Sequence, residues 1–115
     1  MTSRERQYLL DILIAAEDAL TFVRGLRRDD LETNILVQRA VLQCLTVIGE
    51  AAGRIGEPTE LETPALPWRK MKDLRNVIVH DYEGVNLPII WEIVTTELPK
   101  VVVLLHPLFP ERGRP

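Results

Sequence analysis

The sequence has little cysteine, and this scarcity excludes several kinds of protein. Cys44 is the single cysteine among 115 residues, so neither an intrachain disulfide nor a cysteine-based metal cage can form. A lone cysteine also fits a reducing compartment. Cys44 lies between Leu42 and Leu45 in a helical apolar stripe. We therefore expect a buried structural thiol there rather than a nucleophile.

We also expect no segment of the sequence to enter a membrane. The first ten residues, MTSRERQYLL, lack the long apolar core of a signal peptide. The longest uninterrupted apolar run near the C-terminus, 101–105, is far short of the roughly 20 residues that a membrane span needs. We expect a soluble, cytoplasmic protein that does not associate with membranes.

The length and composition suit one small domain. Apolar residues make up 46% of the 115 residues, which is enough to build a core. A chain of this size buries about two-thirds of the surface that it exposes when unfolded, so its stability should be modest unless a partner chain adds burial. We expect a single helical domain over 1–115. Its last part, about 107–115, has no core-forming pattern and should be frayed.

No strand-like alternation persists, and the apolar spacing is helical almost throughout. It predicts helices over about 5–26, 31–55 and 68–80, and a fourth from 87 onward. The second of these is apolar around much of its circumference. Such a helix usually packs on two surfaces, and here one could be the core and the other a subunit interface.

Turn and capping residues separate these helices. Asp29 or Asp30 can cap the second helix and Asn86 the fourth, while the proline-rich stretch 57–67 reads as a surface connection. Pro99 should kink or split the last helix, because its ring clashes one turn back. The sequence therefore predicts an all-α, up-and-down four-helix bundle. The alternative is a looser helical domain without bundle symmetry.

Charge is distributed unevenly. The net charge of −3 argues against a protein that coats nucleic acid in general. Between 69 and 80, however, four cations (Arg69, Lys70, Lys72 and Arg75) stand against one anion, Asp73. A positive segment in an acidic protein indicates a focused anionic ligand.

That segment ends in residues that carry chemistry. Arg75, Asn76, His80 and Tyr82 fall within eight residues of one another. Arginine offers a planar donor fork that matches phosphate oxygens, and histidine can take and return a proton near neutral pH. Together they could cleave RNA without a metal, because the ribose 2′-hydroxyl supplies the nucleophile. Taken alone, His80 would more often be a helix-end histidine than a catalyst, and we expect His106 to be a helix-end histidine as well.

Helix geometry adds a constraint on this pair. At about 100° per residue, Arg75 and His80 lie about 140° apart on one ideal helix, so one helix aims them poorly at a single phosphate. Either Arg75 reaches round with its long side chain, or a second subunit completes the site. We favour the second arrangement, because a two-fold axis would bring two basic helices together.

The motif and its surroundings resemble a known family. RNVIVHDY fits the R-x4-H-x-Y form of the HEPN motif. The stretches VIGEAAGRI, LPWRKMKDLRNVIVHDYEGVN and LPIIWEIVTTELP are similar to the second helix, the motif region and the last helix of HepT proteins. The resemblance covers about 8–105 of the chain. The bare R-x4-H spacing is weak evidence, whereas the motif within these flanks is fairly specific.

The resemblance implies a function and partners. HepT proteins are ribonuclease toxins that dimerise around a shared cleft, and a small nucleotidyltransferase antitoxin, MntA, neutralises them by adding AMP to the motif tyrosine. Carried over, Arg75 would bind the scissile phosphate, His80 would handle protons, Asn76 would orient the site and Tyr82 would be modified. Neither a cofactor nor a metal is expected.

Other interpretations stay open. The chain could be a non-catalytic HEPN module that binds RNA or nucleotide and partners a nucleotidyltransferase, or a helical dimer that acts only as a scaffold. Tyr82 could simply cover the end of its helix, and Asn76 could be an ordinary helix residue. Glu50 and Arg54, four apart, fit an exposed ion pair better than a site role.

Overall fold

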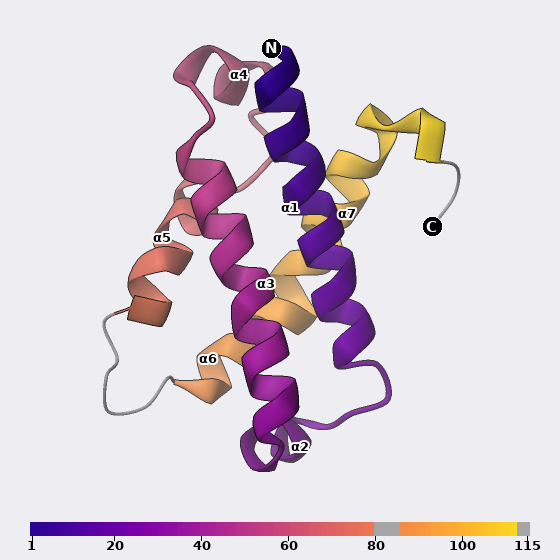
Figure 1. Ribbon diagram of the computed structural model, residues 1–115, viewed down its shortest axis with the longest axis vertical. Coiled ribbons are helices and arrows are strands. Elements are labelled where there is room, and N and C mark those ends of the chain that lie inside the picture. The colour runs from indigo at the N-terminus through magenta and orange to yellow at the C-terminus, as the bar shows by residue number, and fades with distance from the viewer. Residues whose placement is uncertain (80–85, 113–115) are drawn as a thin grey trace.

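The computed structural model describes residues 1–79 and 86–112. Within them the chain is all-α, as predicted, and contains no strand. The long elements are α1 (Ser3–Phe22), α3 (Ile35–Gly53), α5 (Trp68–Val79), and a final run of α6 (Leu87–Glu92), a π-helical turn (Ile93–Glu97) and α7 (Leu98–Leu105). The chain passes up and down through these four, with α3 between α1 and α5 (Figure 1).

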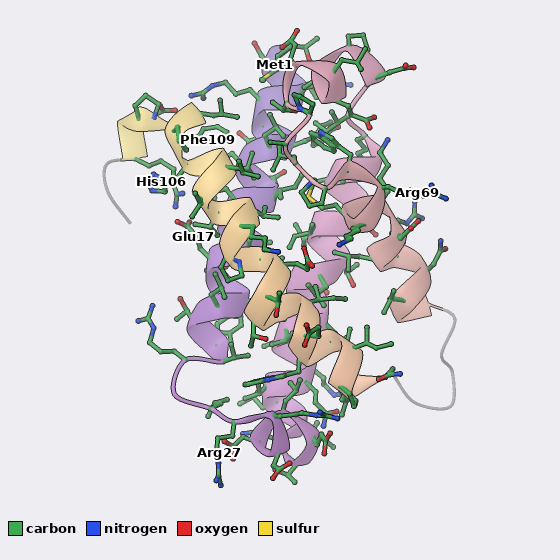
Figure 2. All side chains as sticks on the ribbon, turned by 180° about the vertical axis from the view of Figure 1, so that it is seen from behind. Met1, Glu17, Arg27, Arg69, His106 and Phe109 are labelled. Atoms are coloured by element: carbon green, nitrogen blue, oxygen red, sulfur yellow. The ribbon has the colours of Figure 1, made fainter. Side chains whose placement is uncertain are left out.

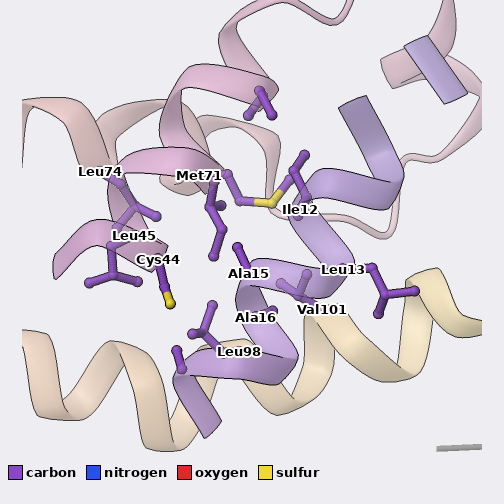
Figure 3. Close-up of a cluster of buried hydrophobic side chains, with 14 of the residues drawn as sticks. Ile12, Leu13, Ala15, Ala16, Cys44, Leu45, Met71, Leu74, Leu98 and Val101 are labelled. Atoms are coloured by element: carbon purple, nitrogen blue, oxygen red, sulfur yellow. The ribbon is translucent and has the colours of Figure 1, made fainter. Parts of the chain in front are cut away.

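The core forms where these helices meet. Figure 3 shows side chains from four helices converging on one another, and all of those that it labels are buried: Ile12, Leu13, Ala15, Ala16, Cys44, Leu45, Met71, Leu74, Leu98 and Val101. Each fully buried aliphatic side chain of this kind stabilises the fold by about 1.5–3 kcal/mol relative to an exposed one. The apolar stripes of the sequence thus face one another, as the helical period predicts.

Two short helices correct the predicted boundaries. The helix expected over 31–55 is divided into α2 (Arg28–Thr33) and α3 by Asn34. The side chain of Asn34 accepts a hydrogen bond from the Val37 N–H at 3.2 Å, which caps α3 from an extended residue. The predicted cap at Asp29 or Asp30 is wrong, because α2 begins earlier and its N-cap is Arg27. Asp30 lies inside the first turn and accepts a hydrogen bond from the Arg27 N–H at 2.7 Å.

The supposed surface connection also contains a helix, α4 (Glu57–Glu62). Its Thr59 is 1% exposed and donates its hydroxyl to the Glu5 carboxylate at 3.0 Å. The same carboxylate accepts from the backbone N–H groups of Gly56 at 2.8 Å and Thr2 at 3.1 Å. These bonds, that of Gly56 first, lower the pKa of Glu5 to about 2. Sequence periodicity missed α4 because contacts with α1 hold it in place.

At Pro99 the last helix changes its type, from a π-helical turn to an α-helix. Pro99 has no N–H to donate to the carbonyl four residues earlier. Directly before it, the Leu98 N–H donates to the Ile93 carbonyl five residues back, which makes the turn π-helical. The π-helical turn therefore leads directly into α7, and Pro99 lies in the first turn of α7.

The C-terminal tail corrects a further expectation, because it is folded as far as Arg112. Two 3₁₀ turns, His106–Leu108 and Pro110–Arg112, carry Phe109 between them, and this ring is 1% exposed (Figure 2). The guanidinium carbon of Arg6 lies 4.6 Å from the centre of the ring, and Arg6 also forms an ion pair with Glu111. The tail is thus docked on α1 rather than frayed.

By length and composition, α3 is the one helix in the described part of the chain that could cross a membrane. It is also the helix that packs between α1 and α5, and core helices of soluble proteins pass the same test. Its buried side chains, among them Val41, Leu45 and Ile48, belong to the core, so the helix gives no indication of a membrane protein.

Candidate functional site

The basic segment forms α5, which is anchored by its apolar side. The helix begins at Trp68, whose ring is buried and whose indole N–H donates to the Thr63 carbonyl at 3.0 Å. Met71 and Leu74 follow at helical spacing and are buried in the core (Figure 3). The side chains described as exposed on this helix are all polar and lie between 69 and 76.

Arg75 and Asn76 are among those exposed side chains. Arg75 comes directly after the buried Leu74 and four residues after the buried Met71, so it lies at the edge of the apolar stripe. His80 and Tyr82 lie outside the described residues. The spatial relation between Arg75 and His80 therefore stays a prediction.

Arg75 does not simply project into water, because its stem rests on α3 at Gly49. A Cβ atom built on Gly49 would lie 3.0 Å from the Arg75 Cγ and 3.2 Å from its backbone nitrogen. At this point α5 approaches α3 more closely than a side chain on α3 would allow. Sequence reasoning missed Gly49 as a site residue. The available signal was a glycine inside an apolar helix, where it costs helix stability and usually has a packing reason.

Carboxylates cancel two of the four cations of the segment. The Lys72 Nζ lies 2.7 Å from the Glu60 Oε2, and the Lys70 Nζ lies 3.4 Å from the Glu97 Oε1. Arg69, which stands away from the bundle in Figure 2, and Arg75 form no ion pair with any described residue. The predicted excess of charge is therefore smaller than the sequence suggests, and two arginines carry it.

Two apolar hollows flank α3 and α5, and neither includes Arg75 or Asn76. A groove of about 300 Å³ separates α5 from the α6–α7 run. Three carboxylates stand around its apolar floor against one cation, Lys70, which disfavours an anionic ligand. The second hollow lies between α1 and α3. An anionic ligand of Arg75 would therefore bind on the exposed surface, outside both hollows.

Cys44 is buried, and Arg54 lies beside an aromatic ring. Cys44 is 8% exposed, and burial, with a smaller contribution from the charge of Asp18, raises the pKa of its thiol to about 11. The predicted burial of this thiol is thereby confirmed. The predicted ion pair of Arg54 with Glu50 is wrong: Arg54 instead lies 5.8 Å from the centre of the Tyr8 ring.

Comparison with known proteins gives consistent matches. Residues 12–107 match the profile of a family described as "Ribonuclease HepT-like". The "Putative RNase MJ1380" of Methanocaldococcus jannaschii is 32% identical over 102 residues, which are 88% of this chain and 94% of that protein. The "Probable ribonuclease HepT" of Thermococcus cleftensis is 32% identical over 101 residues, 88% of this chain and 92% of that one. No solved structure gives a significant match.

Proposed function

Because this chain belongs to the HepT-like ribonuclease family, we propose that it is the RNA-cleaving toxin of a HepT/MntA-type toxin–antitoxin pair, acting in the cytoplasm. The observation that carries the proposal is the placement of Arg75. It is exposed on α5, is held against α3, and pairs with no carboxylate in the described part of the chain. Such a guanidinium is available to a phosphate.

The proposed reaction needs no metal. The ribose 2′-oxygen attacks phosphorus and the bond from phosphorus to the 5′-oxygen breaks, which leaves a 2′,3′-cyclic phosphate and a 5′-hydroxyl. His80 takes the proton of the 2′-hydroxyl, and the leaving 5′-oxygen receives a proton back from the imidazolium. Arg75 binds the phosphate and stabilises the charge that builds on its oxygens, and Asn76 orients the site.

We place a second copy of the chain on the surface shared by α1 and α3. Ile14 and Phe22 are exposed there, and they line the apolar hollow between the two helices together with Val47. A two-fold axis across this surface would bring both copies of α3, each with an Arg75 beside it, toward each other. Phe22→Asp should then yield monomers in analytical ultracentrifugation and lower cleavage. If Phe22→Asp still forms dimers, the interface lies on another surface.

The test of the activity is cleavage of a labelled single-stranded RNA in the presence of EDTA. The parent should cut it and leave a cyclic phosphate end, and His80→Ala should be about 10²–10⁴-fold slower. Equal cleavage by His80→Ala would remove this residue from the mechanism. RNA binding without any turnover by the parent would instead favour the non-catalytic module.

The antitoxin would act through Tyr82. Transfer of AMP to its hydroxyl adds negative charge and bulk close in sequence to Arg75, where RNA phosphate is proposed to bind. After co-expression with a small nucleotidyltransferase of the MntA type, the intact mass should rise by one or more AMP increments. These increments should be missing in Tyr82→Phe. A parent protein without any increment would contradict this mode of control.

A further inference from the structure

We infer that Gly49 is a positioning residue for Arg75: the missing side chain at this point of α3 lets the arginine stem rest on the α3 backbone and so aims its guanidinium. The inference rests on the proposed function, since it assigns Gly49 a part in the use that the site makes of Arg75. Gly49 itself touches no substrate.

The contact is tighter than a side chain on α3 would allow. A Cβ on Gly49 would meet the Arg75 Cγ at 3.0 Å, the Arg75 backbone nitrogen at 3.2 Å and the Met71 carbonyl oxygen at 3.4 Å. The first two distances lie well inside the usual carbon contact range of about 3.5–4.0 Å. Any other residue at this position would push on both the arginine stem and the backbone of α5.

Backbone conformation does not explain the glycine. Gly49 lies within α3, and the one glycine with a positive φ in the described part of the chain is Gly25, in the turn after α1. A glycine inside a helix lowers helix stability relative to alanine. The close approach of α5 is therefore the physical reason for a glycine here.

The close contact at Gly49 mainly involves Arg75. Two of the three atoms nearest the absent Cβ belong to Arg75, and one of them is in its side chain. Arg75 is nevertheless exposed, so the stem is held while the end of the side chain remains accessible. A held stem leaves a long side chain fewer rotamers to lose when it binds a phosphate.

The chain offers a matched control one turn further along α3. A Cβ on Gly53 meets nothing within 4 Å, so Gly53→Ala gains helix propensity without touching α5. Gly49→Ala lies further inside the helix and also gains propensity, but it displaces Arg75 by a few tenths of an ångström. Since misplacement by about 1 Å can cost on the order of 10²-fold, we expect kcat/KM to fall about tenfold in Gly49→Ala. In Gly53→Ala it should stay within about twofold of the parent.

A double-mutant cycle separates positioning from a general structural effect. Arg75→Ala removes the Cγ at 3.0 Å but keeps the backbone nitrogen at 3.2 Å, so adding Gly49→Ala to it should lower the residual cleavage by less than it does in the parent. A defect in folding or helix packing would instead lower activity by the same factor in both backgrounds. That result would overturn the inference, as would full activity of Gly49→Ala in the parent background.

A measurement without cleavage keeps this inference distinct from the proposed function. In two-dimensional NMR spectra, the backbone amide signal of Arg75 should shift in Gly49→Ala and stay in place in Gly53→Ala. If the parent neither binds nor cuts RNA, the proposed function fails, and the positioning role for that reaction fails with it, even where the amide shift verifies the contact. An active parent whose Arg75 signal is unmoved by Gly49→Ala would refute the inference alone.

Discussion

Replacing the cations of α5 one at a time should show that Arg75 meets RNA phosphate while its lysine neighbours do not. Lys72 lies 2.7 Å from Glu60 and Lys70 lies 3.4 Å from Glu97, so both charges are already balanced in the free protein. Arg75 is exposed and pairs with no described residue. Arg75→Ala should therefore weaken the salt dependence of RNA binding, and Lys72→Ala should not.

The size of the effect follows from counterion release. Each phosphate of single-stranded nucleic acid that a protein cation neutralises contributes about −0.7 to the slope of log affinity against log salt concentration. Arg75→Ala should make the slope less steep by about 0.7 for each phosphate that the guanidinium neutralises in the parent. At about 0.1 M salt this corresponds to roughly fivefold weaker binding per phosphate.

The assay is fluorescence anisotropy of a labelled single-stranded RNA. All variants are made in the His80→Ala background, so that the RNA survives the titration. Salt is varied between about 0.05 and 0.3 M, where the linear relation applies. Lys72→Ala serves as the control, because it removes the same formal charge from the same helix.

Two outcomes would refute this reasoning. A change of slope in Lys72→Ala as large as that in Arg75→Ala would mean that the ion pair with Glu60 opens when RNA binds. An unchanged slope in Arg75→Ala would mean that its guanidinium does not reach phosphate, and the proposed site would then have to move from this end of α5.

Two further predictions concern stability. Phe109→Ala should lower the free energy of unfolding in urea by about 3–5 kcal/mol, because it empties a site that is 1% exposed, whereas the same change at exposed Val103 should cost less than about 0.5 kcal/mol. Equal effects would contradict a docked tail. The stability contributed by the Glu5 carboxylate should be fully present above pH 4.5 and be lost as the pH falls toward about 2, because its hydrogen bonds lower its folded pKa. Glu5→Gln should flatten that part of the pH profile of thermal unfolding, and an unchanged profile would show that other carboxylates control it.

Local signals in the sequence were sufficient for the main helices. Apolar residues at helical spacing located α1, α3 and α5, because the side of a helix that meets the core must be apolar wherever its partner lies. Asn86 was also predictable: its side chain accepts from the Ile89 N–H at 3.1 Å and caps α6. Burial of Cys44 followed from the same stripe. The motif likewise pointed to Arg75 and Asn76 as candidates, and the structure leaves both exposed.

Features that depend on another segment could not be predicted in this way. α4 is too short for a periodic signal, and Glu5, far away in sequence, accepts its hydrogen bonds. The aperiodic tail folds because Phe109 has a place on α1 beside Arg6. Both expectations were wrong for the same reason, since propensity and pattern describe a segment without its neighbours.

The sequence by itself determined the helical class, the apolar side of each long helix and the chemical groups of the motif. Tertiary structure alone decided which charges are paired, as Lys72 is with Glu60. It also decided that the stem of Arg75 rests on Gly49 of another helix. The helical period states which side of a helix is buried but not which residue it meets there. Which charges pair and where the arginine side chain points depend on how two helices pack against each other. The sequence of one helix does not contain that information.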